Sequence, residues 1–161
     1  MFLDRMGYLE ETFFTFSFSP IRDETGRVAG LFHPVTELTQ ETLARRRLRV
    51  LRDLAEHARD AQSLETAARL IGESLAGADL DLPFMLFYGL EEGGRRARLL
   101  AQTGVTSPEL APVTIDLEAA EATPWTIDRA ARDGQVQRLD GLRERWGDTA
   151  CGPYPEPPES A

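Results

Sequence analysis

The spacing of apolar residues changes between Thr36 and Gln62 from every second residue to roughly every 3.5 residues, and this change most constrains the fold. A first face has alternating spacings of four and three and contains Ala44, Leu48, Leu51, Ala55 and Ala58. A second face has similar spacing, is interrupted by Arg47 and His57, and contains Leu43, Val50, Leu54 and Ala61. The pattern predicts one helix from about Thr39 to Ala61 with two competing apolar faces. We call residues 37–62 the helical connector.

A hairpin is predicted before the connector. From Thr12 to Ser19, Phe residues alternate with small polar residues, as expected of a half-buried strand. A turn sequence with Gly26 leads to a second apolar run, Val28 to Val35. Two strands alone are marginally stable in water, so the Phe face needs a cover. We expect none from the residues upstream of Thr12.

A helix and a second hairpin are predicted after the connector. Ser63 can cap a helix that ends near Gly77. The continuous apolar run 83–88 is typical of a central strand, and 91–95 turns the chain into a second strand, 97–102.

Further along, Thr123 can cap a helix with Pro124 at its first position, ending at Gly134. Val136–Leu139 is predicted as a short strand. The four prolines after Gly147 indicate a loop or disordered tail over 148–161.

Two stretches resemble sensory domains. The run Gly7-Tyr8-Leu9-Glu10-Glu11-Thr12-Phe13-Phe14-Thr15-Phe16-Ser17-Phe18-Ser19-Pro20-Ile21, with Asp23, Gly26, Val28 and Gly30, resembles the last hairpin of PAS domains in bacterial sensor kinases. Those domains end in Asp-x-Thr before a signalling helix, and Glu37-Leu38-Thr39 stands at the matching place with Glu replacing Asp. The order of elements in 63–147 is similar to the first part of a GAF domain.

The resemblance implies an α+β fold in which antiparallel sheets of PAS type (1–36) and GAF type (63–147), both incomplete, are joined by the helical connector. It implies a fragment of a longer protein. It also implies a homodimer with parallel connectors, in which a small rotation exchanges the Leu48/Leu51 seam for the Val50/Leu54 seam and turns Arg47 and His57 inward.

Composition argues against several function classes. The net charge of −9 opposes binding to nucleic acid and to anionic membrane surfaces. All 18 basic residues are Arg, which excludes lysine Schiff-base chemistry within this chain. One cysteine, Cys151, together with two histidines makes poor material for a metal site. The single cysteine fits a reducing cytoplasm. No apolar run is long enough to insert into a membrane, and no export signal precedes the first strand.

No residue pattern predicts catalysis, a metal or a cofactor. His57 lacks the following Pro of a phosphoacceptor motif and is interpreted as a helix-surface residue. Cys151 lacks the adjacent His of a tetrapyrrole attachment site and is interpreted as an inert loop thiol. In the run 83–88, Phe84, Leu86 and Tyr88 are candidate ligand-pocket residues, and packing in the core is the competing interpretation.

These observations predict a cytoplasmic, non-catalytic segment that transmits a signal within a bacterial two-component protein, whose parent would be a sensor histidine kinase. The alternatives are a module that binds an unknown small molecule through its GAF-like part, and a truncated gene product without independent function.

Overall fold

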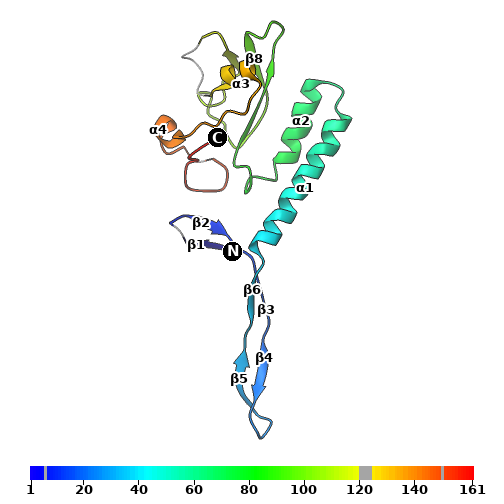
Figure 1. Ribbon diagram of the computed structural model, residues 1–161, viewed down its shortest axis with the longest axis vertical. Coiled ribbons are helices and arrows are strands. Elements are labelled where there is room, and N and C mark those ends of the chain that lie inside the picture. The colour runs from blue at the N-terminus through cyan, green and yellow to red at the C-terminus, as the bar shows by residue number, and fades with distance from the viewer. Residues whose placement is uncertain (6, 120–124, 150) are drawn as a thin grey trace. The chain divides into compact units, whose positions relative to one another are not determined.

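The computed structural model describes residues 1–5, 7–119, 125–149 and 151–161 and has a mixed α+β fold with small antiparallel sheets (Figure 1). Its contacts divide the chain into two compact units, unit 1 (Met1–Arg49) and unit 2 (Val50–Ala161). The boundary between them falls inside one helix.

Unit 1 begins with a hairpin that the sequence analysis did not predict. Strands β1 (Phe2–Asp4) and β2 (Leu9–Glu11) are antiparallel, with Leu3 opposite Glu10. Next to this ladder, the Thr12 amide donates to the Met1 carbonyl at 2.7 Å, and the Met1 ammonium donates to the Thr12 carbonyl at 3.0 Å. Even so, Phe16 and Phe18 remain 60% and 57% exposed, so this hairpin does not cover the Phe face. Strands of three residues are too short to show a period in the sequence.

The predicted Phe-rich hairpin forms, as two successive ladders rather than one. Strand β3 (Phe14–Phe16) pairs with β6 (Val35–Glu37), and β4 (Ser19–Arg22) pairs with β5 (Val28–Phe32). The turn between β4 and β5 is closed by Asp23, whose carboxylate accepts hydrogen bonds from the Thr25 and Arg27 amides at 2.9 and 3.0 Å. Pro34 has no N–H to donate, and it lies where the two ladders separate.

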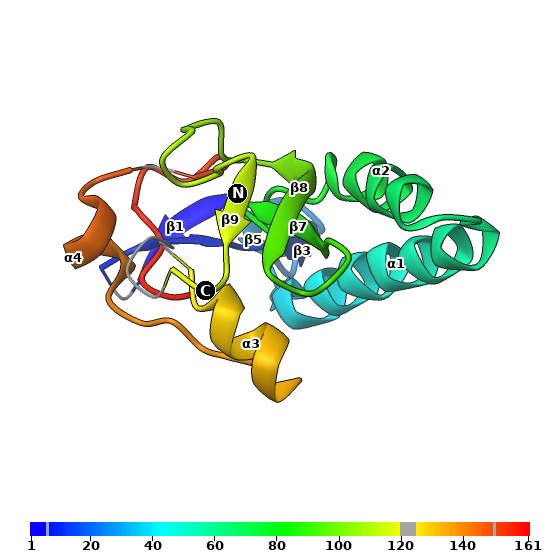
Figure 2. The ribbon, with the colours of Figure 1, turned by 90° about the horizontal axis from the view of Figure 1, so that it is seen from above.

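Helix α1 (Thr39–Asp60, 22 residues) confirms the predicted helix of the connector. Helix α2 (Leu64–Leu75) follows after a short turn, and the Ser63 hydroxyl caps it by accepting from the Thr66 amide at 3.1 Å, as predicted. Within unit 2, the last part of α1 and α2 lie side by side and run in opposite directions (Figures 1 and 2).

The sheet of unit 2 has the order β7-β8-β9, from β7 (Met85–Leu90), β8 (Arg96–Thr103) and β9 (Thr114–Asp116). The hairpin of β7 and β8 was predicted, and β9 was not. The run 83–88 was expected to be a central strand, but among the described residues β7 pairs only with β8. Helix α2 packs on one face of the sheet, where a Cβ at Gly72 would lie 3.4 Å from the Ala101 Cβ.

The other face of the sheet carries most of the core. One cluster contains Val105, Leu110, Ala111 and Cys151. A second contains Trp125, Leu139 and Leu142. Phe84, Leu86 and Trp146 pack against both clusters, so β7 connects them.

The last third of unit 2 is largely irregular. Helix α3 (Ile127–Asp133) ends at Gly134 with φ of 63°, as predicted, whereas the expected cap, Thr123, and the expected first residue, Pro124, lie outside the described residues. A short helix, α4 (Leu142–Trp146), was not predicted.

The predicted strand Val136–Leu139 is wrong. Val136 is 99% exposed, and Leu139 exchanges backbone hydrogen bonds with Ala161, at 2.7 and 2.9 Å, rather than with a neighbouring strand among the described residues. The described part of 148–161 contains no helix or strand, yet it is held in place, because the Tyr154 hydroxyl donates to the Leu80 carbonyl at 2.8 Å.

Candidate functional site

The first candidate site is the junction where the hairpin of unit 1 passes into α1. Thr39, the first residue of α1, is 6% exposed. Its Oγ1 accepts a hydrogen bond from the Phe13 amide at 3.1 Å and donates one to Glu37 Oε1 at 2.7 Å. The Leu38 amide donates to the Phe13 carbonyl at 2.8 Å. The start of α1 is therefore bonded directly to the backbone that enters β3.

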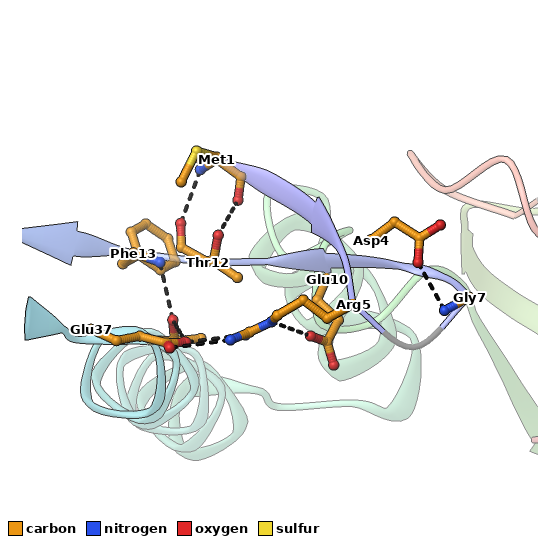
Figure 3. Close-up of polar contacts among 9 residues, drawn as sticks. Met1, Asp4, Arg5, Gly7, Glu10, Thr12, Phe13 and Glu37 are labelled. Atoms are coloured by element: carbon orange, nitrogen blue, oxygen red, sulfur yellow. Dashed lines mark hydrogen bonds and ion pairs between the residues drawn. The ribbon is translucent and has the colours of Figure 1, made fainter.

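Arg5 extends this junction to the first hairpin (Figure 3). Its guanidinium donates to both Glu37 oxygens at 3.1 Å and, through Nε, to Glu10 Oε2 at 3.0 Å. The bidentate geometry fixes the orientation of both side chains. Hydrogen bonds from Arg5 and then from Thr39 lower the pKa of Glu37 below its usual range.

A second ion pair links α1 to β2. Arg46 Nη1 lies 2.6 Å from Glu11 Oε2, and both side chains are less exposed than those of Arg5 and Glu37. Within unit 1, α1 is thus anchored at its first residue and again two turns later.

The two apolar faces of α1 have different surroundings. On the first face, Leu48 and Leu51 are 67% and 61% exposed. On the second face, Val50 and Leu54 are half-buried. The structure thus distinguishes the two predicted seams: the second is already partly covered within the chain, and the first is open.

His57 extends the second face toward α2. Its Nδ1 makes a hydrogen bond with the Ser74 hydroxyl, which itself donates to the Leu70 carbonyl at 2.9 Å. Because the Ser74 proton is used in that bond, Nδ1 of His57 carries the hydrogen it shares with Ser74. The interpretation of His57 as a plain surface residue is therefore wrong: it is half-buried and joins α1 to α2. Arg47, the other interruption, is exposed.

The second candidate site is a cavity of about 420 Å³ in unit 2. All three predicted pocket residues, Phe84, Leu86 and Tyr88, line it. Since side chains alternate along a strand, Leu86 and Tyr88 share the face of β7 opposite α2, and Phe84, just before β7, continues the same alternation. The remaining lining residues are Leu82, Pro83, Met85, Trp125, Ile127, Pro158, Ser160 and Ala161.

The polar atoms of the aromatic lining are bonded to backbone carbonyls. The Tyr88 hydroxyl donates to Pro112 at 2.8 Å, and burial raises its pKa to about 12. Trp125 Nε1 donates to Leu110 at 2.6 Å. The Trp125 ring lies 5.5 Å from that of Phe84 and 4.3 Å from that of Trp146, measured between centroids. These bonds fix the rings and leave carbon surface toward the cavity.

The sequence analysis missed Arg5, Trp125 and the segment 158–161 as site residues. Arg5 and Glu37 are 32 residues apart, and no local pattern pairs them. The proline content of 148–161 suggested a tail, whereas residues 158, 160 and 161 reach the cavity.

Cys151 is buried and its thiol is free, and burial raises its pKa. A raised pKa lowers the thiolate fraction and hence the reactivity of the thiol. The part of the chain that the structure describes contains no group of three or more His, Cys, Asp or Glu residues that could hold a metal ion. Within the same residues, no helix combines the length and the hydropathy required to cross a membrane.

Comparison with known proteins finds no matching family model, no matching curated protein and no matching solved structure.

Proposed function

We propose that this chain is a non-catalytic, cytoplasmic sensory segment of a bacterial two-component signalling protein, in which α1 transmits a conformational change from a PAS-like region to a GAF-like region. The observation that carries the proposal is the path of α1. It begins in hydrogen bonds to the hairpin of unit 1 and continues without interruption across the boundary into unit 2.

The junction makes the coupling mechanical. Any movement of the backbone at Phe13 is passed to Thr39 through one hydrogen bond, and Arg5 links Glu37 to the first hairpin. An α-helix of 22 residues is about 33 Å long and stiff. A displacement at its first turn therefore reaches the turns that belong to unit 2.

The partner of the first face would be a second copy of the chain with its connector parallel. The open apolar stripe around Leu48 and Leu51 has the spacing of a coiled-coil seam. The parent protein would then be a homodimeric sensor histidine kinase. Exposing the second face instead requires that the His57–Ser74 hydrogen bond break, which biases the dimer toward the first seam.

Disulfide trapping tests this proposal. In a Cys151→Ser background, Leu51→Cys is expected to crosslink two chains efficiently. Leu54→Cys is expected to crosslink slowly, because Leu54 is half-buried within its own chain. If neither position crosslinks in the full-length protein, the parallel connector is wrong.

The junction is tested in the same assay. Arg5→Gln removes the three bonds from Arg5 to Glu10 and Glu37 and is expected to change the ratio of crosslinking at positions 51 and 54. Arg27→Gln, in the turn between β4 and β5, is the matched control and should leave the ratio unchanged. An unchanged ratio in Arg5→Gln would show that the junction does not control the helix.

The cavity favours a second candidate function, a module whose main role is to bind a small molecule. Such a module would retain its ligand through purification, and mass spectrometry of the denatured, extracted protein would detect it. Its connector would show no crosslinking preference that depends on Arg5.

A further inference from the structure

The chemistry of the residues that line the cavity in unit 2 limits which molecules it can bind. None of its eleven lining side chains is charged at neutral pH, and the carboxyl group of the last residue, Ala161, already accepts a hydrogen bond from the Leu139 amide at 2.7 Å. Two of the three with a polar hydrogen, Tyr88 and Trp125, donate it to backbone carbonyls. Ser160 is the third. Such a lining offers almost no group to replace the water lost by an ion or by a strongly polar ligand.

Aromatic rings form much of this surface. Phe84 and Trp125 are inclined to one another by 38°, and Tyr88, from β7, is the third ring of the lining. Rings at these inclinations offer both faces and edges, which suit an aromatic guest in stacked or edge-on contact. The volume of about 420 Å³ is a little under three times that of a cavity that holds benzene, which is about 150 Å³.

We infer that this cavity binds an uncharged aromatic molecule of one or two rings. The inference rests on the proposed sensory function only in that such a molecule would be the signal. A carboxylate on the same ring would enter without a partner for its charge, and an ammonium would meet only the Ala161 carboxyl group, which already accepts from Leu139. An isolated charge in an apolar site costs far more than apolar contact returns.

The tryptophans of the chain provide a fluorescence signal for this binding. Its two tryptophans are Trp125, which lines the cavity, and Trp146, which is in ring contact with Trp125. A guest in the cavity alters the surroundings of this pair, so tryptophan fluorescence of the unmodified full chain follows occupancy directly. Simple benzene derivatives do not absorb where tryptophan is selectively excited.

Three probes, each a phenyl ring with a three-carbon chain, test the inference: propylbenzene, 3-phenylpropanoate and 3-phenylpropylammonium. Propylbenzene is expected to change the fluorescence saturably, with an affinity about tenfold or more above that of either ion. No saturable change with propylbenzene would overturn the inference. An ion that binds within about threefold of propylbenzene, or more tightly, would also overturn it.

A charge placed at the cavity supplies a second test. Leu82 is 42% exposed, so Leu82→Arg is tolerated by the fold and brings a cation to the lining. It is expected to raise affinity for 3-phenylpropanoate about fivefold while weakening propylbenzene. Val113→Arg, at a position that is 71% exposed and outside the lining, is the matched control and should change neither affinity. Equal effects of the two variants would count against the cavity as the binding place.

The two proposals fail separately. If propylbenzene does not bind but positions 51 and 54 still differ in crosslinking, the ligand class is wrong and the role of α1 stands. If propylbenzene binds and no crosslink forms, the ligand class stands and signal transmission through a dimer is wrong.

Discussion

Units 1 and 2 are stabilised by different kinds of interaction. Among the described residues, every buried apolar side chain belongs to unit 2, whereas the two buried residues of unit 1 are Thr12 and Thr39. The hairpin of unit 1 exposes large apolar side chains, with Phe16, Phe18, Leu31 and Phe32 each between 57% and 60% exposed. Unit 2 is stabilised by burial, and unit 1 by hydrogen bonds and ion pairs.

This difference bears on the proposed signalling role of α1. A region held by a few polar contacts opens at low free-energy cost, while a packed core changes only as a whole. The polar contacts of unit 1 meet at the first residue of α1. The weaker unit therefore has its strongest connections at the point from which a signal would enter the helix.

The largest predicted effect is a loss of stability of unit 2 when Gly104 is substituted. This glycine has φ of +73°, and a Cβ there would lie 1.9 Å from the Pro83 carbonyl oxygen. Gly104→Ala is expected to reduce the free energy of unfolding by about 4 kcal/mol, because both the backbone strain and the clash must be relieved. Denaturant unfolding followed by tryptophan fluorescence measures it.

Gly94→Ala is the matched control for this substitution. Gly94 has φ of +68°, and a Cβ there meets nothing within 4 Å, so the strain acts alone. Its expected cost is about 1 kcal/mol. Equal costs for the two variants would show that the contact between Gly104 and Pro83 does not form in solution.

The next effect measures the difference between the units with one kind of substitution. Leu142 is 1% exposed in the core of unit 2, and Leu31 is 58% exposed in unit 1. Leu142→Ala is expected to cost about 3 kcal/mol, and Leu31→Ala less than about 0.5 kcal/mol. Both are measured by denaturant unfolding. A large cost at Leu31 would mean that another surface covers the hairpin in solution.

Elements whose determinants are local were predictable. Ser63 and the apolar positions after it predict α2 with its cap, and the spacing of Leu48, Leu51 and their neighbours predicts α1. Helix caps and helical periods are written within one or two turns of chain. The same holds for the hairpin of β7 and β8, whose turn is marked by Gly93 and Gly94.

Elements that depend on distant partners were not predictable. A short strand was predicted over Val136–Leu139, but Leu139 bonds to Ala161, a partner that is not local. The ion pair of Arg5 and Glu37 likewise joins residues that nothing in the sequence connects. At the cavity, the residues of β7 could be nominated from their strand, but Trp125 and residues 158–161 required the fold.

A smaller effect is expected at Thr39. Thr39→Val removes the acceptor of the Phe13 amide and the donor to Glu37 while keeping the shape of the side chain. The loss of these bonds is expected to cost unit 1 about 1.5 kcal/mol. Amide hydrogen exchange at Phe13 should then be roughly tenfold faster. Thr36→Val, in the exposed part of β6, is the control and should leave that exchange unchanged.

The smallest effect is the pH dependence of the junction, and its sign follows from Glu37. Its pKa in the folded chain is lowered from 4.5, first by Arg5 and then by Thr39. A lowered pKa means that the ionised carboxylate stabilises unit 1 at pH values above 4.5, and that this stabilisation is lost as the pH falls through the folded-state value. Protonation of Glu37 should therefore accelerate amide exchange at Phe13 relative to its intrinsic rate.

Carbon-detected NMR titration of the Glu37 carboxyl measures the pKa itself, and in Arg5→Gln this pKa should move up toward 4.5. Both side chains are exposed and screened by solvent, so the change in stability is small even when the titration shift is clear. A Glu37 pKa that is the same in both proteins would mean that Arg5 does not hold Glu37 in solution, and the coupling of the first hairpin to α1 would then depend on Arg46 and Glu11.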